Sequence, residues 1–477
     1  MTVLIRIIQI ILESFNYLVL FYFLALNFFY LTTTIFAFFA LRTYARRMKA
    51  VDLNALIAKA GVPPVTLLAP AYNEEATCIE STKALLALNY PEYEVIIIND
   101  GSKDSTLEVL IEAFDMEPAQ RAALSKLKSA KVRGVYRSKY QPNLWLLDKE
   151  NGGKADALNG GVNFCSTPLF CAMDADTLLE RDALIRIVRP FLEDASTLAA
   201  GGIIRIVNDC TIRSGSVEEI RLPRNLLAKY QVLEYLRAFL SGRMGWSALK
   251  STLIISGAFG VFKRSAVVDV GGYATDTVGE DMELVVKLHR HFLENKIPYN
   301  ISFVPDPVAW TECPESIKIL GRQRDRWQRG LFEVLTRHRV MFMNPRYGRI
   351  GLVAFPYFYL LEMLGPAIEL PGYFVFLISV IWGTVSTSYI IAFFMAAFMF
   401  GVALSIFSVA LEEMTFRRYP RFTDLLKLFM LAIIENFGYR QLTIYWRIHG
   451  FISALRKVEG WGKMERKGFV TSPKGGK

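Results

Sequence analysis

The chain has 477 residues, of which 52% are hydrophobic, and its 55 Lys and Arg exceed its 45 Asp and Glu to give a net charge of +10. Its mean hydropathy of +0.28 is unusual for a soluble chain of this length, which needs a largely polar surface. These figures exclude a simple soluble enzyme, a disordered chain and a small disulfide-linked scaffold.

The first apolar segment lies near the N-terminus. Phe15–Leu41 contains no charged residue and, as a helix, would be roughly 40 Å long, enough to cross a membrane with some tilt. The basic residues that follow it, Arg42, Arg46, Arg47 and Lys49, place its end in the cytoplasm.

A cleaved signal peptide explains this segment less well. The apolar run is far longer than the core of a signal peptide, and the positive charges follow it instead of preceding it. Residues 1–14, which Arg6 and Glu13 interrupt, are expected to lie at the membrane surface.

Residues 51–347 have the composition of a soluble α/β domain. Short apolar runs at 65–70, 93–98 and 169–173 predict buried strands, and residues 75–88 predict a helix between the first two. A strand, a helix and a second strand in this order form a β-α-β unit with a parallel pair. We therefore expect one large α/β domain, or a smaller core with an insertion.

Cysteine and histidine give no sign of disulfide or zinc chemistry. The five cysteines (Cys78, Cys165, Cys171, Cys210 and Cys313) include no CxxC pair, and the four histidines form no HExxH or other ligand set. We expect the cysteines to be ordinary buried residues in a reducing compartment.

The chain becomes apolar again after Tyr347. Residues 351–370 carry two glutamates and two prolines, which predicts a broken or interfacial helix. Pro371–Leu411 contains no charge and can hold two spans that meet near residues 386–388.

Residues 425–455 are also apolar, apart from a few charged side chains. Because charges at membrane depth are costly against lipid, Glu362, Glu435 and Arg440 are expected to face protein or a polar conduit. The basic tail is expected in the cytoplasm, so two or four crossings should follow Tyr347.

These patterns divide the chain into four parts. They are an N-terminal transmembrane helix with its basic flank (1–50), a cytoplasmic α/β domain with interfacial helices near its end (51–347), C-terminal transmembrane and interfacial helices (348–455), and a basic cytoplasmic tail (456–477).

The three predicted strands all end in acidic segments: PAYNEE (70–75), NDGSKD (99–104) and DAD (174–176). One acidic strand end is commonly a helix N-cap, but three bring carboxylates to the edge where open α/β sheets bind ligands. Asp174 and Asp176 suit a divalent ion, Mg²⁺ or Mn²⁺, whose remaining positions water and diphosphate would fill.

Residues 151–159 (NGGKADALN) open a helix with two glycines and Lys154. Free backbone amides at a helix start, with an ammonium beside them, favour phosphate, although a plain capped helix has the same pattern. The chain has no GxxxxGK[ST] loop and no GxGxxG after a strand, which argues against a P-loop or dinucleotide enzyme.

Two later segments add further polar groups. GED (279–281) places Asp281 at a loop-helix junction, where an N-cap is the simpler interpretation. QRDRW (323–327) places an amide, a guanidinium and an indole on a basic helix, where they suit a phosphate and a sugar ring, or anchorage at a membrane interface.

Together these segments resemble the processive family 2 glycosyltransferases, the membrane-integrated relatives of cellulose, hyaluronan and poly-N-acetylglucosamine synthases. PAYNEE, NDGSKDS, NGGKADALN, DAD, SGAFG (256–260), GED and QRDRW occur in the order of that family, between about residues 65 and 329. The chain is most similar to the shorter poly-N-acetylglucosamine-synthase-like members. It departs from many members at Asn99, where they have an aspartate, but retains Asp100.

The resemblance implies a GT-A fold, which is a Rossmann-like α/β domain, and inverting transfer from a nucleotide sugar. It assigns the nucleotide sugar to Tyr72, Glu74, Asp100, Lys154, Asp174 and Arg326. It assigns the metal to Asp174 and more directly to Asp176, the general base to Asp281, and the acceptor to Gly257, Glu280, Gln323 and Trp327.

The implied function is polymerisation of a β-linked polysaccharide from UDP-N-acetylglucosamine or UDP-glucose at the plasma membrane, with export through the protein's own spans. The alternatives are transfer of a single sugar to a membrane lipid, and a non-catalytic transporter or assembly subunit, which would not need intact carboxylates. The expected partners are the UDP-sugar, the growing glycan and membrane lipid, and accessory export or regulatory subunits are compatible with this function. Nucleic acid is not expected, because the basic residues gather at span ends and beside Trp327.

Overall fold

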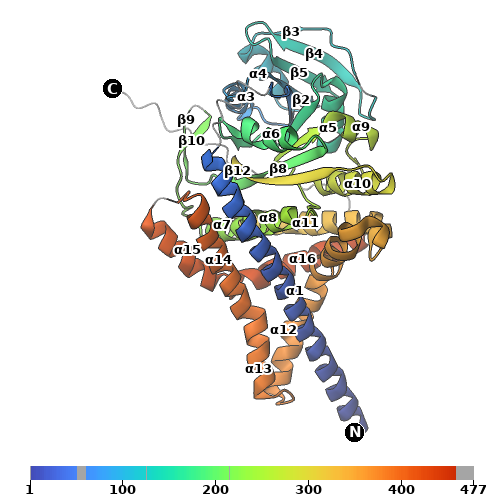
Figure 1. The fold of residues 1–477 in the computed structure, drawn as a ribbon, viewed down its shortest axis with the longest axis vertical. Coiled ribbons are helices and arrows are strands. Elements are labelled where there is room, and N and C mark those ends of the chain that lie inside the picture. The colour runs from blue at the N-terminus through green and yellow to red at the C-terminus, as the bar shows by residue number, and fades with distance from the viewer. Residues whose placement is uncertain (1, 51–60, 125, 214, 420, 458–477) are drawn as a thin grey trace.

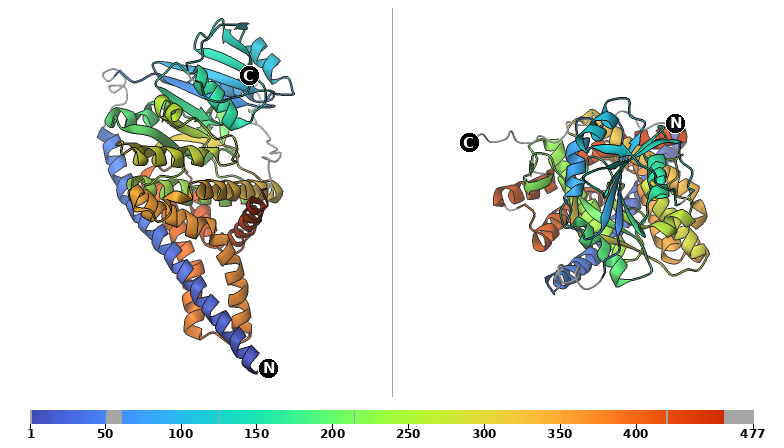
Figure 2. Two further views of the ribbon diagram at one scale, coloured as in Figure 1. Left: turned by 90° about the vertical axis from the view of Figure 1, so that its right-hand side faces the viewer. Right: turned by 90° about the horizontal axis from the view of Figure 1, so that it is seen from above.

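The computed structural model describes residues 2–50, 61–124, 126–213, 215–419 and 421–457. An α/β domain occupies one end of the molecule, and long helices extend from it toward the N-terminus at the other end (Figures 1 and 2). Between the two lies a set of helices that we call the interfacial layer. It consists of α7 (Leu226–Tyr235), the π-helix η1 (Leu236–Gly242), α8 (Arg243–Ala248), α11 (Ile317–Arg337) and α16 (Tyr439–Leu455).

The main sheet has ten strands in the order β3-β4-β5-β2-β1-β6-β11-β8-β12-β7. These strands are β1 (Val65–Ala71), β2 (Tyr93–Asp100), β3 (Met116–Pro118), β4 (Val132–Ser138), β5 (Leu144–Lys149), β6 (Leu169–Met173), β7 (Leu178–Leu179), β8 (Thr197–Ile206), β11 (Phe259–Lys263) and β12 (Asn300–Thr311). β1 pairs in parallel with β2 and β6, and β2 with β5, whereas β11 runs antiparallel to β6 and β8. A separate hairpin consists of β9 (Thr211–Arg213) and β10 (Ser216–Glu219).

Helices cover both faces of this sheet, because its central strands are apolar on both sides. Leu67 of β1 packs into the core beneath α3 (Cys78–Leu86), α4 (Thr106–Ala113) and α6 (Ala183–Glu193). Leu68 points to the opposite core, beneath α5 (Lys154–Phe164), α9 (Arg264–Asp269) and α10 (Glu280–Glu294). Continuous apolar runs are typical of such doubly covered parallel strands.

The elements predicted around the first β-α-β unit are confirmed. The strands expected at 65–70, 93–98 and 169–173 are β1, β2 and β6, and the β1–β2 pair is parallel. The helix expected at 75–88 is α3, which is shorter at both ends. It begins later because the amides of Thr77 and Cys78 both donate to the carbonyl of Glu74 in a turn before the helix.

Helix α1 (Thr2–Ala50) is continuous over 49 residues. Arg6 and Glu13 both lie within α1, so no break separates residues 2–14 from the apolar segment that follows. Their location at the membrane surface stays a prediction. The helix also continues through the basic flank.

The C-terminal part contains a bent pair of helices and a hairpin. Its elements are η4 (Ile350–Ala354), η5 (Tyr357–Met363), α12 (Gly365–Ile381), α13 (Thr387–Phe394), η6 (Met395–Met399), α14 (Phe400–Thr415) and α15 (Phe422–Ile434). The helices bend by 44° between Met363 and Gly365, which confirms the broken helix predicted at 351–370. α13 begins after its N-cap Ser386, where the two spans were predicted to meet.

Among the described residues, two helices are long and apolar enough to cross a membrane, 6–48 and 387–415, and the bent pair makes a third if it counts as one span. The apolar stretch at 425–455 forms α15 and α16, neither of which meets this criterion. α16 instead packs along α11 in the interfacial layer. This arrangement favours two crossings over four after Tyr347.

Charged groups in the C-terminal helices face protein, as predicted. Glu435 is fully buried and accepts hydrogen bonds from Arg237 and Ser405. Glu362 accepts from the hydroxyl groups of Tyr30 and Tyr357, at 2.9 and 2.7 Å. These pairings offset the cost of placing a carboxylate near lipid.

The four cysteines other than Cys210 are buried, Cys210 is partly buried, and all five are unpaired thiols, in agreement with the sequence. The predicted boundaries of the four parts stay predictions. Residues 51–60 and the predicted basic tail beyond residue 457 lie outside the described residues.

Candidate active site

The acidic segments predicted at the strand ends lie at one edge of the sheet. Ala71 at the end of β1 pairs with Asn99 of β2, and Asp100 pairs with Lys149 at the end of β5. On the other side of β1, β6 ends immediately before Asp174. Because these four strands are parallel, the loops that follow them meet at this edge.

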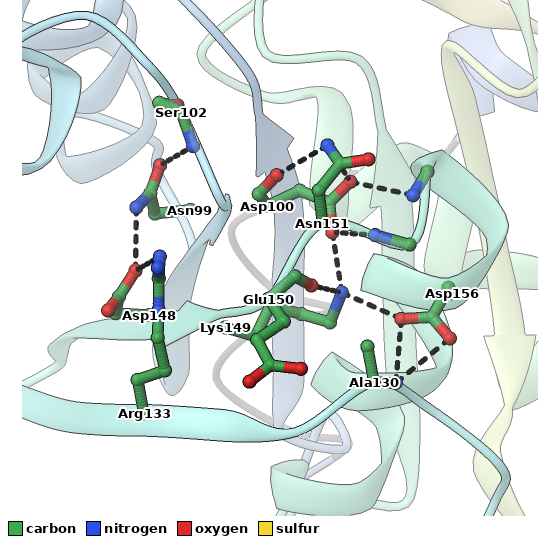
Figure 3. Close-up of polar contacts among 12 residues, drawn as sticks. Asn99, Asp100, Ser102, Ala130, Arg133, Asp148, Lys149, Glu150, Asn151 and Asp156 are labelled. Atoms are coloured by element: carbon green, nitrogen blue, oxygen red, sulfur yellow. Dashed lines mark hydrogen bonds and ion pairs between the residues drawn. The ribbon is translucent and has the colours of Figure 1, made fainter.

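Asp100 anchors the loop that leads into α5. Its carboxylate accepts from the Lys149 ammonium at 2.5 Å, the Asn151 amide at 3.2 Å, and the backbone amides of Gly152 and Gly153 at 3.1 and 2.8 Å (Figure 3). A carboxylate offers about four lone-pair sites, so protein donors fill them all.

This geometry corrects one step of the sequence argument. The amides of Gly152 and Gly153 were expected to be free for phosphate, but an internal carboxylate already accepts from both. Contact between Asp100 and the nucleotide stays a prediction. In this structure Asp100 shapes the turn at Gly153, whose φ of 85° favours glycine.

Lys149, which the sequence analysis did not single out, is the centre of this network. The side chain is completely buried, and the ammonium donates to Asp100 and to the Glu150 carbonyl at 2.6 Å and forms an ion pair with Asp156 at 2.7 Å (Figure 3). A buried ammonium is costly unless it is paired and hydrogen-bonded, and here it has three oxygen partners. Its position beside the NGG segment was the only signal in the sequence.

The departure at Asn99 has a local explanation. The Asn99 side-chain amide donates to Asp148 at 2.7 Å, and its oxygen accepts from the Ser102 amide at 3.3 Å (Figure 3). Arg133 also donates to Asp148. An aspartate at position 99 would face Asp148 with like charge, so asparagine is the complementary residue here.

Tyr72 and Glu74 lie in the loop after β1, which is tied to the loop after β2. The Glu74 amide donates to the Thr106 hydroxyl at 2.9 Å, and the Glu74 carboxylate accepts from Thr77 at 2.7 Å. Asn73 adopts a positive φ of 56°. Tyr72 is 44% exposed, so its ring is available at the surface of the sheet edge.

Lys154, in the first turn of α5, reaches across to the end of β6. Its ammonium donates to Asp174, and to the carbonyl of Gly257 at 3.2 Å, with Glu280 at 3.9 Å. Burial alone would lower the pKa of Lys154, but the charges of Asp174 and Glu280 outweigh it and raise that pKa above its usual value. Lys154 is therefore a cation held among carboxylates.

Asp281 and Glu280 begin α10, as predicted for the loop-helix junction. Asp281 accepts from the Gly257 amide at 3.0 Å, so α10 and the SGAFG loop are joined directly. Burial is the largest influence on Glu280 and, with the nearby charge of Asp281, raises the pKa of this carboxyl to about 7 despite Lys154.

Two cavities meet at Asp281. A small one of about 10 Å³, room for one water, is lined by Lys154, Gly257, Glu280 and Asp281. A large one of about 450 Å³ also has Asp281 and Ser256 in its wall and continues between the interfacial layer and the membrane helices, as far as Glu362 and Glu369. This volume is within the range of ligand-binding pockets.

Helix α11 brings one of its three predicted residues to the large cavity. Trp327 lines it, is 39% exposed, and stacks against the Arg324 guanidinium at 4.2 Å. Gln323 is buried and Arg326 half-buried, and in the described part of the chain neither belongs to the wall of either cavity.

Asp174 and Asp176 fit a divalent ion as two oxygen ligands at the end of β6. Asp174 already holds a positive group, the Lys154 ammonium, while Asp176 is buried. The described residues contain no cluster of three or more His, Cys, Asp or Glu arranged to hold a metal. Diphosphate and water would have to complete the coordination of Mg²⁺ or Mn²⁺.

Comparison with solved structures shows the fold class of the protein. A mannosyltransferase from Pyrobaculum calidifontis, solved with GDP-Man and Mn²⁺, matches 91% of this chain and 100% of its own length, with a TM-score of 0.50 at 19% identity. At this identity the match shows the fold alone, and it confirms the predicted GT-A class.

The sequence comparisons then identify the family. Residues 63–330 match the family described as "Glycosyltransferase like family 2". A poly-beta-1,6-N-acetyl-D-glucosamine synthase of Staphylococcus aureus (strain COL) is 31% identical over 326 residues, 68% of this chain and 67% of that relative. The Staphylococcus epidermidis protein of the same name is 31% identical over 324 residues, 68% of this chain and 66% of its own. The chain belongs to glycosyltransferase family 2, as predicted.

Proposed function

We propose that the protein is an inverting, processive glycosyltransferase that polymerises a β-linked polysaccharide from a UDP-sugar. The observation that carries this proposal is the position of Asp281, which lines both the small cavity beside Lys154 and the large cavity that continues to the membrane helices. The staphylococcal relatives are named as poly-N-acetylglucosamine synthases, which favours UDP-N-acetylglucosamine over UDP-glucose as the donor.

The donor would bind at the edge formed by β1, β2 and β6. Tyr72 and Glu74 border the nucleoside, and Asp100 keeps the loop before Lys154 in position. The small cavity is too small for a sugar, so donor binding separates Lys154 from Asp174 and frees its ammonium for the diphosphate.

Asp174 and Asp176 would hold Mg²⁺ or Mn²⁺, which would supply positive charge to the diphosphate. Arg326 on α11 is proposed to act on the same diphosphate, with Gln323 and Trp327 framing the acceptor. Arg326 and Gln323 lie outside both cavity walls in this structure, so these contacts require α11 to move toward the donor.

Asp281 would act as the general base. A sugar hydroxyl is a weak nucleophile, so a carboxylate must take its proton as it attacks the anomeric carbon. The bond to the diphosphate breaks on the opposite face, and a single displacement of this kind inverts the configuration to β. The Gly257 amide, which donates to one oxygen of Asp281, orients that carboxylate.

The large cavity would receive the product. Its wall contains fixed charges near the membrane helices, namely Arg237, Arg440, Arg447, Glu362 and Glu369. A hydroxyl-rich chain cannot cross hydrocarbon unaided, whereas this polar lining can replace its water. We propose export through this cavity, with the catalytic domain in the cytoplasm because basic residues follow the first span.

Incubation of the purified full-length protein with single radiolabelled UDP-sugars and Mg²⁺ or Mn²⁺ tests the proposal. We expect a long polymer from UDP-N-acetylglucosamine, sized by gel filtration and sensitive to a β-specific glycosidase. A product of one sugar on a lipid would replace the proposal by single transfer to a membrane acceptor. Absence of any labelled product with every donor would contradict both.

A further inference from the structure

The wall of the large cavity carries five arginines, and four of them have a polar partner within the protein. Arg237 pairs with Glu435, Arg324 with Glu234, Arg440 with Asn436, and Arg447 with Glu362 and Gln328. Arg324 also has buried atoms without a partner, Nε and Nη1, but Glu234 holds its Nη2. Within the described residues, the fifth arginine, Arg243, has no such polar side-chain partner, and its buried Nη1 atom has no hydrogen-bond partner. An unsatisfied buried donor is destabilising, so an exception of this kind calls for an explanation.

The local structure directs Arg243 toward the cavity. It is the first residue of α8, directly after the π-helix η1. Residues of this turn, including Phe239 and Gly242, line the cavity beside Arg243. The guanidinium lies over the Phe239 ring at 4.0 Å, which fixes its plane. π-helical turns are rare and frequently occur at functional sites.

Arg243 also interacts electrostatically with Asp281, the proposed general base. Burial lowers the pKa of Arg243 to about 10, and the charge of Asp281 is the largest influence that opposes this. Arg243 nevertheless stays charged at neutral pH. A cation therefore lines the same cavity as Asp281, where an acceptor sugar must present its hydroxyl.

The chemistry of a guanidinium limits what it can bind there. Arginine has only donors, so its partner must be an oxygen that accepts. The donor proposed above carries a neutral N-acetylated sugar, so the acceptor chain that grows from it is neutral as well. A neutral glycan of N-acetylglucosamine also offers hydroxyl, ring and glycosidic oxygens, but its N-acetyl carbonyl is the strongest acceptor among them.

We infer that Arg243 binds the N-acetyl carbonyl of the acceptor's terminal sugar and so selects N-acetylated glycans. This inference rests on the proposed function and deepens it, since it concerns the acceptor end of the same site. Arg243 holds the acceptor while Asp281 takes the proton from its hydroxyl.

The test compares two acceptors on the full-length protein in detergent, with UDP-N-acetylglucosamine as donor. One acceptor is a short oligosaccharide of N-acetylglucosamine, and the other has a terminal glucose in place of the terminal N-acetylglucosamine. We expect the wild type to have an acceptor KM at least tenfold lower for the first. Arg243→Met should reduce this preference below threefold and leave the KM of the donor within twofold of wild type.

Two further variants separate this role from a structural one. Arg243→Lys keeps the charge but loses the planar fork, so its preference should be intermediate. Arg213→Met is the control, because Arg213 is 78% exposed and distant from the site, and it should match the wild type. Calorimetric measurement of UDP binding reports whether each variant is folded.

If the wild type polymerises but Arg243→Met keeps the tenfold preference, the role of Arg243 is wrong while the proposed function stands. If Arg243→Met does not fold, the wild-type comparison still decides, because equal KM values for the two acceptors contradict the inference. If the wild type makes no polymer from any donor, the proposed function and the inference both fail.

Discussion

Replacement of Lys149 by methionine should destabilise the catalytic domain and weaken donor binding. Methionine keeps much of the length of the side chain but removes the ammonium that lies between Asp100 and Asp156. Lys149 is completely buried, and the carboxylate of Asp100 is 4% exposed, so water cannot replace the lost partner.

The magnitude follows from this burial. Removal of one partner from a buried ion pair costs about 3–5 kcal/mol, because the remaining charge is left uncompensated. For a domain of this size, 1 kcal/mol corresponds to a shift in Tm of roughly 2–4 °C, so we expect a loss of about 6 °C or more. The KM for the donor should also rise, since Asp100 orients the loop before Lys154.

Tryptophan fluorescence, recorded during thermal unfolding of the purified protein, measures this loss of stability. Lys83→Met is the matched control, because its ion pair with Glu80 is exposed and worth less than about 1 kcal/mol. The double variant Lys149→Met/Asp156→Asn should recover part of the loss by removing one stranded carboxylate. A Tm for Lys149→Met within 2 °C of the control, a threshold set at roughly the shift from 1 kcal/mol, would refute the reasoning.

Two further predictions concern residues that line the small cavity, and a third concerns Asp176, which follows β6. Glu280→Gln should stabilise the domain above pH 7 and not at pH 4.5. Folding raises the pKa of Glu280 to about 7, so the wild type loses up to about 3 kcal/mol of folding stability as the pH rises from 4.5 to above 7. Equal Tm differences between the variant and the wild type at both pH values would contradict this prediction. Gly257→Ala should slow sugar transfer at least about tenfold with little change in Tm, because its added Cβ would lie 2.7 Å from the Lys154 ammonium. A variant that transfers sugar at the wild-type rate would show that this contact is harmless. Asp176→Asn should abolish the effect of Mn²⁺ on UDP affinity in calorimetry, and an unchanged effect would remove this carboxylate from the metal site.

Local patterns were sufficient to predict the sheet edge. The apolar runs that became β1, β2 and β6 each end in acidic residues, and parallel pairing necessarily brings such ends together. The sequence also predicted where two helices begin, α5 after two glycines and α10 at Glu280, because a helix start depends on a few neighbouring residues.

The network around Lys149 could not be predicted in the same way. A lysine at a strand end normally points to solvent, and its burial here depends on Asp100 from β2 and Asp156 from α5. The same partners decide that the amides of Gly152 and Gly153 are occupied. Such long-range pairings have no periodic signal in the sequence.

The position of α16 also depended on packing. The helix falls short of the length and apolarity of a membrane span, and Gly450 lets its backbone approach α11 so closely that a Cβ there would lie 2.5 Å from the Asp325 carbonyl oxygen. Gly321 of α11 lies against Trp446 in the same way. Close contact through glycines fixed this helix in the interfacial layer.

We propose that Asp281 activates the acceptor at the junction of the two cavities. Asp281→Asn keeps an oxygen that can accept from the Gly257 amide, but it removes the base. We expect polymer formation from radiolabelled UDP-N-acetylglucosamine to fall at least about 100-fold while UDP affinity stays within twofold. A variant that polymerises at the wild-type rate, or that loses UDP binding together with activity, would contradict the assignment of the base.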